Sequence, residues 1–137
     1  MNARWFLRLS AILAWLFAIM LLFNARSFEA PVGIDVTPKI ATIAQAQGAI
    51  LLGLGVINWM AAAIEDQGAV LAVLLGNLVV QLASLGVAGR ALLLGIFPPA
   101  AAPAVIIHTL LTIGFGWYLA RTRRDTMSRR TLGASRV

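Results

Sequence analysis

The chain has 137 residues, of which 61% are hydrophobic and 12% are charged, and its formal net charge is +6. Soluble domains average about 45–50% apolar and about 25% charged residues, so this composition excludes an ordinary soluble domain and indicates one small membrane domain. The lack of cysteine excludes disulfides, thiolate metal sites and paired-cysteine redox centres.

The first apolar stretch, residues 5–23, predicts a transmembrane helix, because at about 1.5 Å per residue it nearly spans a hydrocarbon core of about 30 Å. A cleaved signal peptide is the alternative, since Arg4 and Arg8 precede the apolar run. The run is long for a signal peptide, and residues 24–30 offer no small-x-small cleavage site. We therefore favour a retained helix followed by an outer loop.

The second stretch, residues 40–64, predicts a second transmembrane helix with a seam of small residues. Gly48, Gly55 and Ala62 recur every seven positions, so another helix backbone can approach closely along this line. Packing within the chain is the favoured interpretation, and packing against a partner chain is the alternative.

The third stretch, residues 69–89, follows a short polar link and predicts a third helix. Its end is ambiguous, because Arg90 is followed by the apolar residues 91–97. These residues either extend the helix or lie in the outer membrane interface. We favour the interface, since Arg90 would otherwise have to snorkel from inside a longer helix.

The fourth stretch, residues 100–120, predicts the last helix, with prolines at its start as helix first turns tolerate. Residues 121–137 form a basic tail without apolar periodicity. We expect this tail to be disordered until it meets lipid or a partner.

The distribution of positive charge predicts the orientation. Four spans place both termini on one side, and that side has eight basic residues while the other has three: Arg4, Arg8, Arg121, Arg123, Arg124, Arg129, Arg130 and Arg136 against Arg26, Lys39 and Arg90. Because basic residues favour the cytoplasmic side, both termini are predicted to be cytoplasmic, in a cell inner membrane or plasma membrane. Trp5, Trp59, Trp117 and Tyr118 fall near the same face, as an interfacial aromatic belt requires.

Deep within the predicted spans, the polar side chains are amides, hydroxyls and a single histidine. No Asp, Glu or Lys lies deep in any span, which argues against ion-coupled transporters, including the small multidrug exporters that rely on a glutamate in the first helix.

These polar side chains fall on shared helix faces. Asn77 and Gln81 are four residues apart, and Gln47 and Asn58 are eleven apart, or about three turns. Depths taken from each helix end, at about 1.5 Å per residue, place Gln47, Gln81 and His108 in one layer. The favoured interpretation is that such groups bond across helices and lock the bundle. The sharper hypothesis is a hydrated pocket or pore for a neutral solute, lined by Gln47, Asn77, Gln81 and His108.

His108 is the only histidine. It could ligate a haem iron or carry protons, but the chain offers no second axial ligand unless a methionine or a symmetry-related chain supplies it. A hydrogen-bonded role is the default. We predict no catalytic residue, no metal site and no cofactor.

The segment Ala46-Gln47-Gly48-Ala49-Ile50-Leu51-Leu52-Gly53-Leu54-Gly55-Val56-Ile57-Asn58-Trp59, following an outer loop, resembles the small bacterial membrane proteins of the broad DoxX-like, four-helix style. The resemblance covers these fourteen residues and the number of spans. It implies a four-helix membrane fold but no agreed activity and no catalytic residue.

The sequence therefore predicts an all-α, integral membrane, antiparallel four-helix bundle at residues 1–120, with a basic cytoplasmic tail at 121–137. The predicted function is a non-enzymatic structural or accessory subunit, with an oligomeric pore or carrier for a small neutral solute as the alternative. The expected partners are the lipid bilayer, anionic lipids at the tail, and further copies or another membrane protein. Nucleic acid is not expected, because the basic residues flank apolar segments.

Overall fold

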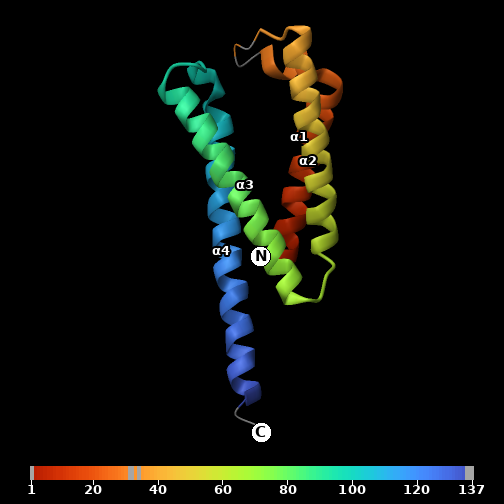
Figure 1. Ribbon diagram of the computed structural model, residues 1–137, viewed down its shortest axis with the longest axis vertical. Helices are drawn as coiled ribbons and strands as arrows, with labels where there is room; N and C mark the ends of the chain where they lie inside the picture. Colours follow the sequence, from red (N-terminus) through yellow and green to blue (C-terminus); the bar gives the residue numbers. More distant parts are fainter. Residues whose placement is uncertain (1, 31–32, 34, 135–137) are drawn as a thin grey trace.

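The structure, a computed structural model, describes the backbone of residues 2–30, 33 and 35–134 and the side chains of these residues up to 125. It has four long helices and a short 3-10 helix, and the described residues contain no strand: α1 (Ala3–Glu29), α2 (Pro38–Ala61), α3 (Gln67–Leu93), η2 (Pro99–Ala101) and α4 (Ala102–Ala134) (Figure 1). The predicted all-α fold with four helices is confirmed. All four are long and apolar enough to cross a membrane, which marks a multi-pass membrane protein.

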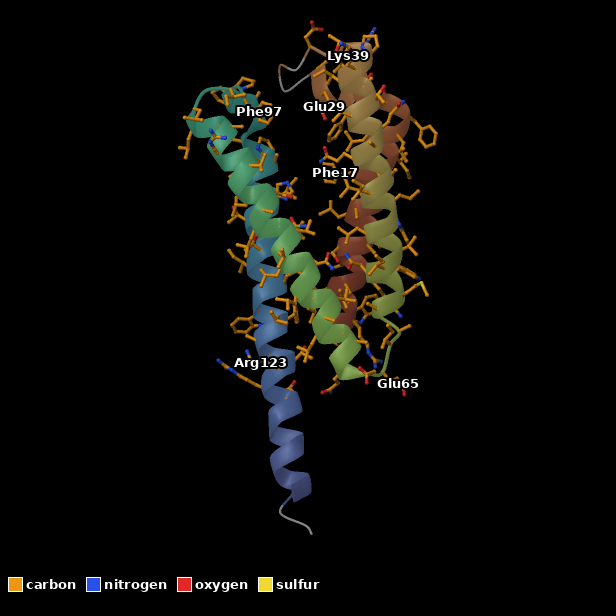
Figure 2. All side chains as sticks on the ribbon, in the orientation of Figure 1. Phe17, Glu29, Lys39, Glu65, Phe97 and Arg123 are labelled. Atoms are coloured by element: carbon orange, nitrogen blue, oxygen red, sulfur yellow. The ribbon has the colours of Figure 1, made fainter. Side chains whose placement is uncertain are left out.

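The helices form two antiparallel hairpins, α1 with α2 and α3 with α4 (Figure 1). The hairpins meet at one end and diverge toward the other. Glu65 and Arg123 lie at the joined end, while Glu29, Lys39 and Phe97 lie at the open end (Figure 2). The start of α1, the α2–α3 link and residues 118–125 of α4 are therefore on one side of the molecule.

Helix packing differs between the two ends. At the joined end, Leu7, Ala61, Leu74 and Phe115 belong to one buried cluster, so all four helices contribute to it. Toward the open end, a second cluster is built from α1 and α2 alone, around Leu21, Ala25 and Ala44. The two hairpins are thus joined mainly at the first cluster.

Aromatic side chains gather at the joined end. Phe6 packs edge-on against Phe115, at 4.8 Å between ring centroids, and stacks on Tyr118 at 4.9 Å. The guanidinium of Arg8 lies over the rings of Trp5 and Trp59, at 5.2 and 5.7 Å from their centroids. The residues predicted to form an aromatic belt are therefore found at the same end of the bundle.

The small-residue seam of α2 packs within the chain, as favoured from the sequence. A Cβ atom added at Gly55 would lie 2.4 Å from the indole of Trp15, and one at Gly48 would lie 3.0 Å from the carbonyl oxygen of Ala18. Ala62, at the end of this seam, is buried in the four-helix cluster. Only glycine lets α1 approach α2 this closely.

The ends of α1 and α3 differ from those predicted. α1 continues to Glu29, and the non-helical backbone of Asn24 (φ −143°, ψ 38°) marks a kink near the predicted end. α3 continues through Arg90 to Leu93, so our preference for ending it before Arg90 was wrong. In this longer helix the apolar side chain of Ala91 is buried and the charged side chain of Arg90 is exposed, so the helix need not end at Arg90. Gly95, at φ +67°, then reverses the chain.

α4 also extends further than predicted, to Ala134, so the backbone of most of the expected tail is helical. An existing helix extends without a new nucleation step. In addition, no glycine that would favour a helix end occurs between Gly116 and Gly133. The side chains of Arg129, Arg130 and Arg136, predicted to meet anionic lipid, lie outside the described side chains.

Candidate functional site

Side-chain hydrogen bonds connect the two hairpins by joining Asn58 of α2 to Asn77 of α3. The Nδ2 group of Asn58 donates to Asn77 Oδ1 at 3.0 Å, and Asn77 Nδ2 donates to Asn58 Oδ1 at 2.7 Å. Both side chains are buried, with exposed fractions of 1% and 3%. This reciprocal pair satisfies a donor and an acceptor of each amide in a setting where water is excluded.

Neighbouring groups complete the bonding of this pair. Asn58 Nδ2 also lies 3.4 Å from Ser10 Oγ of α1, and Asn77 Nδ2 donates to the carbonyl oxygen of Val73 at 2.9 Å. No buried side-chain nitrogen or oxygen in the described part of the chain lacks a hydrogen-bond partner. The interior polar groups therefore bond to one another and link α1, α2 and α3.

A second polar contact lies within the α3–α4 hairpin. His108 Nδ1 is 2.7 Å from Gln81 Oε1. Because an amide oxygen only accepts, Nδ1 carries the proton in this contact, and in the neutral imidazole Nε2 is then an acceptor. Among the described residues, no group of three or more histidine or acidic side chains is placed to hold a metal ion.

The structure does not bring the four predicted pocket residues into one group. Asn77 pairs with Asn58 and Gln81 pairs with His108, whereas Gln47 is exposed on α2 and makes none of the described side-chain hydrogen bonds. A solute pocket lined by all four stays a prediction.

The predicted single layer is wrong because the ends of α2 and α3 are not level. Asn58 is three residues before the end of α2, whereas its partner Asn77 is ten residues after the start of α3. α3 therefore begins about 10 Å beyond the end of α2, counting 1.5 Å per residue. Gln47 is eleven residues from this pair and Gln81 is four, so Gln47 lies about 10 Å further toward the open end.

Gln47 belongs to an exposed apolar face of α2. Ile43, Ile50 and Ile57 flank it at seven-residue spacing and are 67%, 72% and 52% exposed. Gln47 shares its side of α2 with Asn58, but it is exposed, so no described helix of this chain covers it. Sequence reasoning missed this face, although the isoleucine spacing alone could have indicated it.

Comparison with protein-family models, curated proteins and solved structures gives no match to this chain. The resemblance to DoxX-like proteins therefore stays a prediction.

Proposed function

We propose that the protein is a non-enzymatic structural membrane protein that assembles with further copies of itself through the exposed face of α2. The observation that carries this proposal is Gln47. Its exposed amide lies nine residues, about 14 Å, along α2 from Pro38, at a depth where lipid offers no hydrogen-bond partner. An unpaired amide in hydrocarbon is costly, so a partner amide in the membrane is favoured.

A second copy supplies such an amide at the right depth. An amide is both donor and acceptor, so two glutamines can pair reciprocally, as Asn58 and Asn77 do within the chain. Two copies related by a twofold axis along the membrane normal have their Gln47 side chains at the same depth by symmetry. An unrelated partner would need a polar group at that depth by coincidence.

The apolar residues beside Gln47 support the same assembly. Ile43, Ile50 and Ile57 repeat every seven residues, the spacing at which left-handed helix pairs keep one seam in contact. A single polar residue in such a seam fixes the register of the two helices. Gln47 is suited to this role on an otherwise apolar face.

The pairing of the interior polar groups favours a structural role over solute binding. Asn58, Asn77, Gln81 and His108 have their bonding partners within the chain. We further propose that both termini are cytoplasmic in a cell inner membrane or plasma membrane, because the side that carries them has most of the basic residues.

The proposal is tested by energy transfer between donor- and acceptor-labelled copies diluted in lipid vesicles. Wild-type protein should associate, and Gln47→Leu should weaken association about 3- to 30-fold, the range expected for one interhelical polar contact. Gln45→Leu is the matched control, because the Gln45 amide donates to the Leu22 carbonyl within the chain at 3.2 Å. Unassociated wild type contradicts self-assembly, and equal association of wild type and Gln47→Leu contradicts assembly through Gln47.

A pore or carrier for a small neutral solute is the second candidate. It is supported by the diverging hairpins (Figure 1) and by helical spacing, which puts Gln47 and Gln81 on the sides of α2 and α3 that carry the Asn58–Asn77 contact. Closure of the hairpins would bring these two helix sides together around a solute. A carrier requires solute flux into vesicles that Gln81→Leu abolishes, and absence of flux with the wild type rules it out.

A further inference from the structure

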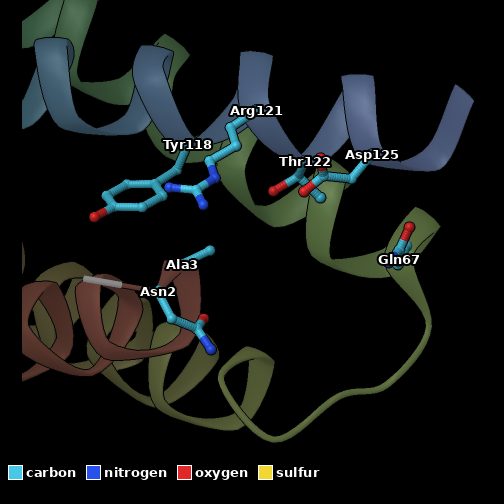
Figure 3. Close-up of a pocket in the computed structure, with 7 residues that line it drawn as sticks. All are labelled: Asn2, Ala3, Gln67, Tyr118, Arg121, Thr122 and Asp125. Atoms are coloured by element: carbon cyan, nitrogen blue, oxygen red, sulfur yellow. The ribbon is translucent and has the colours of Figure 1, made fainter. Parts of the chain in front are cut away.

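A pocket of about 310 Å³ lies at the joined end, where the starts of α1 and α3 meet one face of α4 (Figure 3). Its volume is at the lower end of the range of about 300–1,000 Å³ for ligand pockets. The polar and aromatic residues that line it are Asn2, Gln67, Tyr118, Arg121, Thr122 and Asp125. None of them belongs to the contacts described above except Tyr118.

The pocket lies at the level of lipid headgroups. α4 is mainly apolar up to Ala120, and polar or charged side chains follow from Arg121 to Asp125. Tyr118 is buried and stacks on Phe6, so the aromatic part of the pocket is on the hydrocarbon side. This change from apolar to charged residues marks the membrane–water interface.

The pocket presents one positive and one negative charge in a defined order. Arg121 and Asp125 are four residues apart on α4, both are exposed, and both line the pocket. Among the residues that the structure describes, no ion pair within 4.0 Å involves either side chain. Arg121 is nearer the apolar span, and Asp125 lies about one turn, or 5–6 Å, further toward water.

We propose that this pocket binds the phosphoethanolamine headgroup of a phospholipid. In a bilayer the phosphate of such a lipid is nearer the hydrocarbon and the ammonium is further out. Arg121 therefore meets the phosphate through charge-assisted hydrogen bonds, and Asp125 accepts from the ammonium. Asn2 accepts the backbone N–H of Arg4 through Oδ1, at 2.8 Å, which leaves its amide N–H groups as further donors to phosphate.

The acidic residue makes the pocket selective among headgroups. A purely anionic headgroup would bring its phosphate near the Asp125 carboxylate without an ammonium to neutralise it. A choline headgroup has the same charges, but its trimethylammonium has no N–H to donate to that carboxylate. Among these three kinds of headgroup, only ethanolamine offers both a phosphate to Arg121 and an N–H donor to Asp125.

Native mass spectrometry of the full chain titrated with lipids of identical acyl chains tests the inference. The probes are phosphatidylethanolamine, phosphatidylcholine and phosphatidylglycerol. The wild type should bind the ethanolamine lipid about tenfold more tightly than the other two, as expected for one additional charge-assisted contact. Arg121→Gln should lose this binding, and Asp125→Asn should lose the preference for ethanolamine over choline.

Matched controls keep the test specific to the pocket. Arg123→Gln removes the same charge from the opposite side of α4, and Glu65→Gln removes an acid from the nearby link; neither residue lines the pocket. Both should bind as the wild type does. Equal binding of ethanolamine and choline lipids, a preference for the glycerol lipid, or unchanged binding by both pocket variants overturns the inference.

The phosphoethanolamine group could come from a lipid or from the free compound, and a competition experiment with soluble O-phosphoethanolamine distinguishes the two. Displacement of bound lipid by the soluble compound at millimolar concentration identifies the free compound as a ligand as well, and failure of displacement identifies the lipid alone.

The inference rests on the membrane placement of the helices but not on self-assembly. A protein that stays monomeric in vesicles and still selects ethanolamine lipid would refute the proposed assembly and leave this site intact.

Discussion

At the residue scale, the buried pair of Asn58 and Asn77 is a polar link between the hairpins. Replacing one asparagine by leucine leaves the other amide buried with unpaired groups, which costs about 1–3 kcal/mol. The double replacement removes both amides and should cost less than the sum of the single changes. We expect a coupling of about 0.6–2 kcal/mol in a double-mutant cycle of unfolding in micelles. Additive effects would show that the two amides do not interact.

The approach of α1 to α2 depends on Gly55. Gly55→Ala places a methyl group against the Trp15 indole, which itself donates to the Leu52 carbonyl at 3.3 Å. We expect the free energy of unfolding in micelles to fall by about 1–3 kcal/mol, as for other overpacked contacts. Gly53→Ala is the control, because its Cβ meets no atom within 4 Å. Equal stability of the two variants would contradict the close packing at Gly55.

The role of a residue could be predicted from the sequence where its spacing along a helix alone determines that role. The seven-residue recurrence of Gly48 and Gly55 predicted the seam, because only small residues allow close backbone approach. The partner of Asn77 was not predictable, since an amide can pair with any polar group at its level. That level was misjudged because depths counted from helix ends assume that the ends of α2 and α3 are aligned.

At the scale of the helices, the ends were the least predictable feature. Arg90 was expected to stop α3, but an exposed arginine with a long side chain is compatible with a helix that continues to Leu93. The kink at Asn24 and the positive φ of Gly95 depend on backbone geometry that the hydropathy pattern does not report.

The extension of α4 gives a direct test at this scale. A chain truncated after Asp125 lacks residues 126–134, which are helical. Its far-ultraviolet circular dichroism, expressed per molecule, should therefore lose the signal of about two and a half turns, at 3.6 residues per turn. An unchanged signal per molecule would show that this segment is not helical in solution.

At the scale of the whole molecule, the number of spans and the antiparallel order were predictable and the divergence of the hairpins was not. Length and apolar composition identify four spans. In a membrane, however, lipid-facing residues are as apolar as those in the core, so hydropathy does not show which faces are covered. Ile50 faces outward and Leu74 is fully buried, although both are large aliphatic residues.

The proposed orientation is testable without background labelling, because the chain has no cysteine. Asp35→Cys, in the loop between α1 and α2, should react with a membrane-impermeant thiol reagent added to intact cells. Glu65→Cys, in the link between α2 and α3, should react only after the cells are opened. The reverse pattern would place both termini outside.

The most direct test of self-assembly is native mass spectrometry of the protein taken from its host membrane into lipid nanodiscs without detergent. Wild-type protein should be found at two or more times the chain mass, and Gln47→Leu should shift the distribution toward single chains. A wild-type protein found only as single chains, or only bound to a different protein, would contradict assembly through α2.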